Sequence, residues 1–205
     1  MCSSANAQDE RYIKKLLLGK LGAKKGKAQR PSPPKWAAYS SIYRFDLNGD
    51  GHKEMFFHSK SDSVDYFHFY DHNERPLLKV KLEPMGAKSA PYKMRIVDLD
   101  KTKRLFMIYF YEGFTKFYGL DATVRLYLVT MDHADLNSLS VKKGPVLWME
   151  RERRGNRYVK RENFTEIFDY NKDGIKDLRV FHGKLSRVYF YQGAGKWRAL
   201  GDKIF

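Results

Sequence analysis

Apolar and polar residues alternate along several short segments of this chain, and this pattern predicts β-strands rather than helices. In the segment VDYFHFY, residues 64–70, Phe67 and Phe69 fall on one face of an extended chain, while the tyrosines and the histidine fall on the other. Val188 and Phe190 oppose their neighbouring tyrosines in the same way. We expect the phenylalanine and valine faces to be core, and the tyrosine faces to be partly wet because tyrosine hydroxyls need hydrogen-bond partners.

The expected strands recur in a fixed order that indicates three repeats. In each repeat a short strand leads into an acidic loop, the loop leads into a second apolar strand, and a third strand follows. The first copy occupies residues 41–70 and the last copy residues 164–192. Between them, residues 92–130 keep the strand order but have an altered loop, and the longer spacing to the last copy indicates an insertion.

The first 35 residues differ in composition from the rest. Residues 24–35 contain three prolines, a glycine and no large apolar side chain, which is typical of a linker. Before them, four apolar residues recur at helical spacing among lysines: Ile13, Leu16, Leu17 and Leu21. We therefore expect a short basic amphipathic helix and a linker in residues 1–35, followed by a β-repeat domain in residues 36–205.

Two loops carry the same arrangement of oxygen donors. The segments FDLNGDGHKEMFF, residues 45–57, and FDYNKDGIKDLRVF, residues 168–181, each place an acid or amide at loop positions 1, 3, 5 and 9 and a glycine at position 6. Ca²⁺ takes six to eight such oxygens, including a backbone carbonyl at position 7. The expected ligands are Asp46, Asn48, Asp50, the carbonyl of His52 and Glu54 in the first loop, and Asp169, Asn171, Asp173, the carbonyl of Ile175 and Asp177 in the second. The alternative is a metal-free turn in which the acids bond their own backbone.

The middle loop lacks part of this set. Asp98 and Asp100 are present, but Thr102 stands at position 5 and Lys103 replaces the glycine. The positive charges of Lys103 and the neighbouring Arg104 disfavour a dication in this loop. We predict two Ca²⁺ sites rather than three.

An EF-hand is excluded because position 12 is Phe57 in one loop and Val180 in the other, and because a strand follows each loop. A calcium loop between strands resembles the FG-GAP/VCBS repeat family, the β-propeller blades of integrin α-like and many secreted bacterial proteins. The resemblance covers residues 38–205, without the Phe-Gly and Gly-Ala-Pro signatures. It implies an all-β fold of three propeller-like antiparallel repeats. Closed propellers need four to eight blades, so we expect an open or partial propeller, or a homo-oligomer in which two chains complete a ring.

The formal net charge of +15 is concentrated near the N-terminus, where residues 1–40 hold nine Lys or Arg against two acids. A second basic segment, residues 151–161, contains a Gly-Asn turn and predicts a basic hairpin. The candidate residues for an anionic partner are Lys14, Lys15, Lys20, Lys24, Lys25, Lys27, Arg30, Arg151, Arg153, Arg154 and Arg157. The alternative for both segments is a solvated surface that binds nothing.

The N-terminal residues also indicate the compartment. Cys2 is the single cysteine, so no intramolecular disulfide forms, and Ala5-Asn6-Ala7 has the small-x-small form of a signal-peptide cleavage site. Cys2 is then either lipidated or lost with the signal peptide. No segment is long and apolar enough for a transmembrane span. We expect a secreted, periplasmic or cell-surface protein.

No GxSxG, HExxH or phosphate-loop motif is present, so we expect no enzymatic activity. The predicted function is a calcium-stabilised binding or scaffold module that docks a protein or an anionic envelope component. One alternative is a basic protein associated with nucleic acid, although no recognised nucleic-acid module accompanies the charge. The other is a hydrolase on a propeller-like scaffold.

Overall fold

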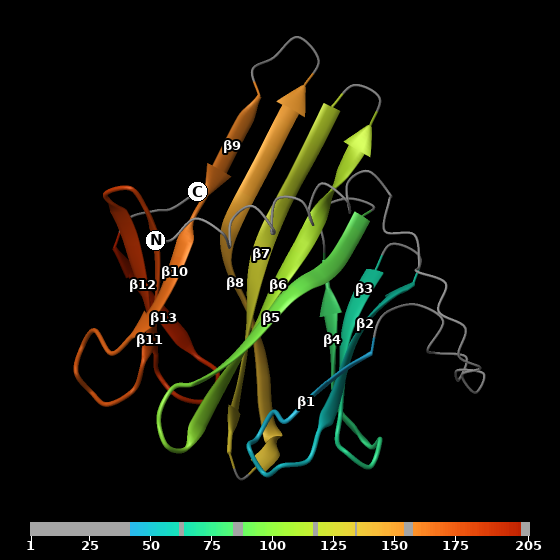
Figure 1. The fold of residues 1–205 in the computed structure, drawn as a ribbon, viewed down its shortest axis with the longest axis vertical. Coiled ribbons are helices and arrows are strands. Elements are labelled where there is room, and N and C mark those ends of the chain that lie inside the picture. Colours follow the sequence, from blue (N-terminus) through green and yellow to red (C-terminus); the bar gives the residue numbers. More distant parts are fainter. Residues whose placement is uncertain are drawn as a thin grey trace, which may run out of the picture. The chain divides into compact units, whose positions relative to one another are not determined.

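The structure is a computed structural model, and the residues it describes are 42–61, 64–83, 88–116, 119–133, 135–153 and 158–201. These residues form β-strands and no helix (Figure 1), so the all-β prediction is confirmed. The helix and linker predicted for residues 1–35 lie outside the described residues. The part of the chain that the structure describes contains no helix capable of crossing a membrane.

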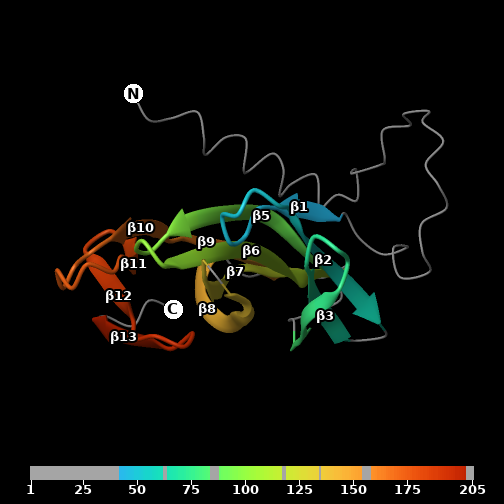
Figure 2. The same cartoon turned by 90° about the horizontal axis from the view of Figure 1, so that it is seen from below.

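The strands form three antiparallel sheets that follow one another along the chain, and neighbours in each sheet are neighbours in sequence. The N-terminal sheet contains β1 (Tyr43–Phe45), β2 (Glu54–Ser61), β3 (Val64–Tyr70) and β4 (Pro76–Leu82). The middle sheet contains β5 (Lys88–Asp98), β6 (Lys103–Lys116), β7 (Gly119–Asp132), β8 (Asp135–Arg153) and β9 (Val159–Glu162). The C-terminal sheet contains β10 (Phe164–Phe168), β11 (Asp177–His182), β12 (Leu185–Tyr191) and β13 (Trp197–Gly201). The middle sheet curls into a half-barrel and lies between the other two sheets (Figures 1 and 2).

The middle sheet has the longest strands, and β6 is buried on both faces. Residues 105–113 of β6 are all buried, which explains why residues 105–111 are a continuous apolar run rather than an alternating one. β6 pairs with β7 along its whole length, from Lys103 opposite Asp132 to Lys116 opposite Gly119. The insertion expected in the middle copy is therefore the lengthening of these strands.

The N-terminal sheet packs its phenylalanine face against the middle sheet. Phe56, Phe67 and Phe69 are fully buried, as the alternation in β3 predicts. Phe56 meets Phe106 with ring centroids 5.6 Å apart, and Phe67 meets Phe110 at 5.3 Å, both edge to face. Such aromatic pairs contribute about 0.5–1.5 kcal/mol each beyond the area they bury. This core holds the first acidic loop at the end of the middle sheet.

The C-terminal sheet buries the opposite face from the one that alternation in β12 suggests. Tyr191 is buried, together with Leu178 and Val180 of the neighbouring strand, whereas Val188 and Phe190 are only partly covered. The expectation that the Val188 and Phe190 face is core was therefore wrong. Alternation shows which residues share a face, but the packing of whole sheets decides which face is covered.

Candidate functional site

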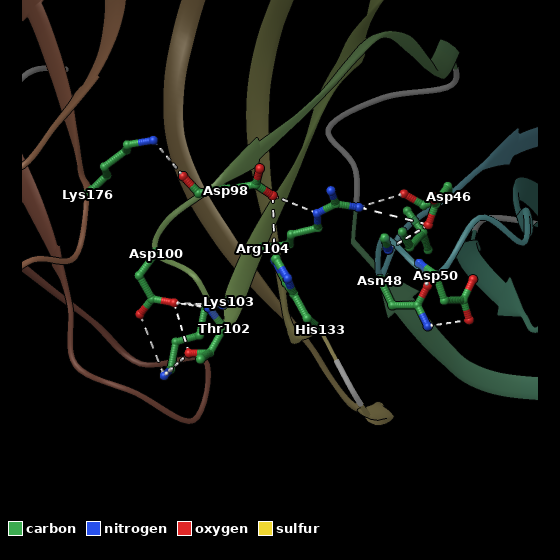
Figure 3. A network of polar contacts seen from close by, with 12 residues as sticks. Asp46, Asn48, Asp50, Asp98, Asp100, Thr102, Lys103, Arg104, His133 and Lys176 are labelled. Atoms are coloured by element: carbon green, nitrogen blue, oxygen red, sulfur yellow. Dashed lines mark hydrogen bonds and ion pairs between the residues drawn. The ribbon is translucent and has the colours of Figure 1, made fainter.

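Three acidic loops join the first and second strands of the three sheets, and they lie together at one end of the molecule (Figure 3). They are the β1–β2 loop, residues 46–53, the β5–β6 loop, residues 99–102, and the β10–β11 loop, residues 169–176. Two of them are the calcium loops predicted from the sequence, and the third is the altered middle loop.

In the β1–β2 loop, Asp46 at position 1 organises the backbone. Its Oδ1 accepts a hydrogen bond from the Gly49 N–H at 2.6 Å, and its Oδ2 accepts one from the Gly51 N–H at 3.1 Å. Both glycines have positive φ, 87° and 88°, a conformation that side chains disfavour. The two glycines therefore allow the chain to wrap around the Asp46 carboxylate.

Asp50 at position 5 closes the same loop. Its Oδ1 accepts the His52 N–H at 2.7 Å, and its Oδ2 accepts a hydrogen bond from Nδ2 of Asn48 at 2.8 Å. The bond from Asn48, followed by that from His52, holds the pKa of Asp50 below its usual value. The Asp50 carboxylate is therefore ionised near neutral pH.

The β10–β11 loop repeats this layout with one difference: its position-1 acid accepts the position-5 N–H, whereas Asp46 accepts the position-4 N–H. Asp169 accepts hydrogen bonds from the Asp173 N–H at 3.2 Å and the Gly174 N–H at 2.9 Å. Asp173 accepts bonds from Nδ2 of Asn171 at 2.7 Å and from the Ile175 N–H at 2.8 Å. Gly174 has φ 88°, and position 4, which is Lys172 here, also has positive φ, 60°. The two loops thus share positive φ at positions 4 and 6 despite different residues at positions 2, 4, 7 and 9.

The acid at position 9 lies buried beneath each loop. Oε2 of Glu54 accepts the Leu47 N–H at 2.7 Å, and Oδ2 of Asp177 accepts the Tyr170 N–H at 3.1 Å. The two side chains are 0% and 1% exposed. Oε1 of Glu54 is buried without a hydrogen-bond partner among the described residues.

The surroundings of these position-9 carboxyls disfavour their ionised forms. Burial raises the pKa of Glu54, and the nearby charges of Asp50 and Asp46 raise it further. Burial likewise raises the pKa of Asp177, with added repulsion from the acids at positions 5 and 1 of its loop. A cation among these groups would relieve both effects.

The middle loop neutralises its acids with cationic side chains instead. Nε of Arg104 donates to Oδ1 of Asp98 at 2.6 Å, and this bond holds the pKa of Asp98 below its usual value. Asp100 accepts the Thr102 N–H at 2.6 Å and has Nζ of Lys103 at 3.8 Å. Arg104 and Lys103 thus supply positive charge where a metal ion would supply it in the other loops.

Two cationic side chains join the three loops into one network (Figure 3). Nη1 of Arg104 donates to the carbonyl oxygen of Asp46 at 3.1 Å, beside Gly49, where a Cβ would come within 3.0 Å of the guanidinium carbon. On the other side, Nζ of Lys176 donates to the carbonyl oxygen of Asp98 at 3.0 Å, and the Lys176 N–H donates to that of Leu99 at 2.9 Å. The sequence suggested that Arg104 disfavours a metal, but it carried no signal for these contacts between loops.

An open pocket of about 620 Å³ lies between the middle loop and the β10–β11 loop. Its charged lining combines two carboxylates with three bases: Asp98, Asp100, Lys101, His133 and Lys176. Nε2 of His133 lies 3.5 Å from Oδ1 of Asp98. Both signs of charge therefore line the pocket.

The donor set of the two predicted loops fits Ca²⁺, because every side-chain donor is a carboxylate or amide oxygen and Glu54 has an oxygen without a partner. Within the described ranges, however, no three His, Cys, Asp or Glu side chains are gathered closely enough to form a ready ion site. The amide NH₂ groups of Asn48 and Asn171 face Asp50 and Asp173. Both amides would have to turn to offer an oxygen to an ion.

The residues predicted to bind an anionic partner are only partly described. Pairing of Arg151 with Val159 confirms the hairpin at residues 151–161. Nε of Arg151 donates to Oδ2 of the buried Asp121 at 3.0 Å, so this arginine anchors β8 to β7 and exposes only part of its charge. Arg153 ends β8. The remaining candidates lie outside the described residues: Lys14, Lys15, Lys20, Lys24, Lys25, Lys27, Arg30, Arg154 and Arg157.

Comparisons of the chain with protein-family models, with curated proteins and with solved structures find no match. The paired loops are therefore the feature of this chain from which a function can be inferred.

Proposed function

We propose that this chain is a calcium-stabilised, non-enzymatic binding or scaffold module whose three sheets are propeller-like repeats of the FG-GAP/VCBS type. One observation carries the proposal: in the β1–β2 and β10–β11 loops, far apart in sequence, the position-1 acid accepts the position-6 N–H, the position-5 acid accepts the position-7 N–H, and positions 4 and 6 have positive φ. An ordinary polar turn is not expected to recur at two places in one chain with a buried acid beneath it each time.

In this proposal Ca²⁺ supplies positive charge to the acids and ties the end of the first strand to the start of the second. The ligands are Asp46, Asn48, Asp50, the His52 carbonyl and Glu54, and in the other loop Asp169, Asn171, Asp173, the Ile175 carbonyl and Asp177. Glu54 and Asp177 anchor the strand below the loop through the N–H at position 2. In the first loop, the bonds from Asn48 and His52 hold the pKa of Asp50 below its usual value, so this proposed ligand is ionised.

The middle loop supports a count of two ions. Arg104 and Lys103 already lie against Asp98 and Asp100, so a dication there would meet two fixed positive charges. The Arg104 and Lys176 contacts join all three loops, and ions at the two outer loops would therefore stiffen the whole end of the fold.

The binding part of the proposal rests on the charge of +15 and on its concentration in residues 1–40. A positively charged protein attracts anionic surfaces over about a Debye length, 8 Å at physiological ionic strength. The proposal requires calcium for the loops and an anionic partner for the basic segments. An exported protein is exposed to millimolar calcium and to anionic envelope components. We therefore propose a secreted, periplasmic or cell-surface location.

Isothermal titration with calcium tests the metal sites. The wild type should bind two ions, Asp50→Ala and Asp173→Ala should each bind one, and the double variant should bind none. The matched control is Asp100→Asn in the middle loop, which should still bind two ions. If the wild type takes up no calcium, the proposal fails, and if the control loses an ion, the middle loop is a third site.

A further inference from the structure

Three of the six exposed large apolar side chains among the described residues lie on one face of the C-terminal sheet. Phe164 is 44%, Phe168 59% and Leu200 47% exposed. The strand register places Phe164 beside Phe181 and Val188 beside Leu200, so these residues share a face. This face, the β10–β13 face, comprises Phe164, Glu166, Phe168, Asp177, Arg179, Phe181, Ser186, Val188, Phe190, Arg198 and Leu200.

The equivalent face of the N-terminal sheet is a core surface. When the two calcium loops are superposed in sequence, Phe168 corresponds to Phe45, which packs on Phe106 of the middle sheet at 5.1 Å. Through the strand register, Val188 corresponds in the same way to Phe69, which is fully buried. The C-terminal sheet thus presents to solvent the face that its N-terminal counterpart covers with another sheet. An apolar surface of this kind marks an interaction site.

The charges on the β10–β13 face indicate what covers it. Glu166 and Arg179 lie opposite each other on neighbouring strands, with Nη1 of Arg179 3.3 Å from Oε2 of Glu166. The hydroxyl of Tyr170 donates to the same carboxylate at 2.7 Å. Apart from Arg198 on the edge strand and Asp177, which is buried, the face therefore carries one acid and one base amid apolar side chains. When two copies of such a surface face each other about a two-fold axis, the acid of each copy can lie opposite the base of the other.

We propose that the β10–β13 face docks a second copy of this chain, face to face about a two-fold axis. The two-fold arrangement brings Glu166 of one copy toward the partner's Arg179, and the reverse contact follows by symmetry. Most of the remaining charge on the chain is positive and repels a second copy, whereas this face combines apolar contact with opposite charges. The inference goes beyond the calcium and anion binding proposed above and does not depend on either.

The size of the face limits the strength of the dimer. Four strands about 4.8 Å apart, each contributing about five residues of 3.3 Å, give a footprint of roughly 300 Å² per copy. A standard interface buries about 800 Å² per partner. We therefore expect a weak dimer whose population rises with protein concentration and with salt, because salt screens the overall repulsion.

A charge exchange tests the geometry. By sedimentation velocity over a concentration series, the wild type should dimerise reversibly, and Glu166→Arg and Arg179→Glu should each weaken self-association about tenfold because like charges then face each other. A mixture of the two variants should form a heterodimer, since one face is then basic and the other acidic. A wild type that stays monomeric throughout, or a mixture that associates no better than the separate variants, overturns the proposal.

An apolar substitution provides the second test. Phe168→Ser should weaken the dimer, whereas Leu185→Ser should leave it unchanged, because Leu185 is 48% exposed on the same sheet but lies off the β10–β13 face. Melting curves for each variant check that the chain remains folded. If Leu185→Ser weakens association as much as Phe168→Ser, the contact lies elsewhere and the assigned face is wrong.

Discussion

Replacing Arg104 with methionine should destabilise the calcium-free protein and yet tighten its binding of calcium. Arg104 donates to Asp98 at 2.6 Å and to the Asp46 carbonyl at 3.1 Å, and its Nη1 lies 3.9 Å from the Asp46 carboxylate. The first contact lies within the middle sheet, and the second joins this sheet to the β1–β2 loop of the N-terminal sheet. The third places a positive charge beside a proposed ligand of the first calcium loop. Methionine keeps most of the apolar stem of arginine. It removes both the stabilising contacts and the positive charge beside the proposed ligand.

The size of each effect follows from these contacts. The pair with Asp98, whose side chain is 52% exposed, contributes less than about 1 kcal/mol, and the bond to the partly buried carbonyl contributes about 1 kcal/mol. A loss of about 1–2 kcal/mol lowers the melting temperature of a chain of this size by roughly 2–8 °C. For the metal, a Ca–O bond of about 2.5 Å added to the 3.9 Å contact puts the two cations about 6 Å apart. In water, the repulsion between Ca²⁺ and the guanidinium is then about 0.6 kcal/mol with salt screening and about 1.4 kcal/mol without it. Removing the guanidinium charge therefore corresponds to a three- to tenfold gain in calcium affinity at this loop.

The assay is a pair of melting curves, in chelator and in calcium, together with calorimetric titration of both proteins. The matched control is Lys101→Met, which removes the same charge from an exposed position in the middle loop. We expect that control to change neither stability in chelator nor calcium affinity by a measurable amount. If Arg104→Met binds calcium with unchanged or lower affinity, then no ion binds beside the Arg104 guanidinium and the placement of the first site is wrong.

Two further predictions concern pH. The pKa values of Glu54 and Asp177 are raised above their usual 4.5 and 3.8, so in chelator their contribution to stability is present at low pH and is lost as pH rises through the folded-state values. Calcium favours the ionised forms, so the rise in melting temperature on adding calcium should grow with pH over this range; a rise independent of pH would contradict the role of these acids. His68 has the opposite sign, because burial and then the charge of Lys79 lower its pKa from 6.5 to about 4, so stability is lost as pH falls from 6.5 through 4. After allowance for partial exposure we expect this loss to be about 1–2 kcal/mol, and His68→Gln should remove it in acid melting curves.

Local sequence was sufficient for the strands and loops of the outer sheets. The segments VDYFHFY and FTEIF coincide with β3 and β10, because period-two alternation and flanking turn residues act over a few neighbouring positions. The turns at Gly51 and Gly174 were also expected, and both have positive φ. The candidate ligands at positions 1, 5 and 9 could be named for the same reason, since each bonds to backbone within its own loop.

The middle sheet was harder to predict. The sequence indicated one repeat with an insertion, whereas the structure has a half-barrel of long strands with an additional strand, β9. A strand buried on both faces loses its alternation, so a continuous apolar run such as residues 105–111 does not show where the strand ends or what it packs against. Strand length there depends on pairing partners that lie farther along the chain.

The sequence by itself thus determined which residues alternate, where the chain turns and which acids share a loop, because these properties depend on near neighbours. Tertiary structure alone decided that Arg104 reaches Asp46 and that Lys176 reaches Asp98, contacts that span 58 and 78 residues. It also decided that β12 buries its tyrosine face and leaves Val188 and Phe190 partly uncovered. Both outcomes depend on how whole sheets pack against one another, and no pattern within a single strand contains that information.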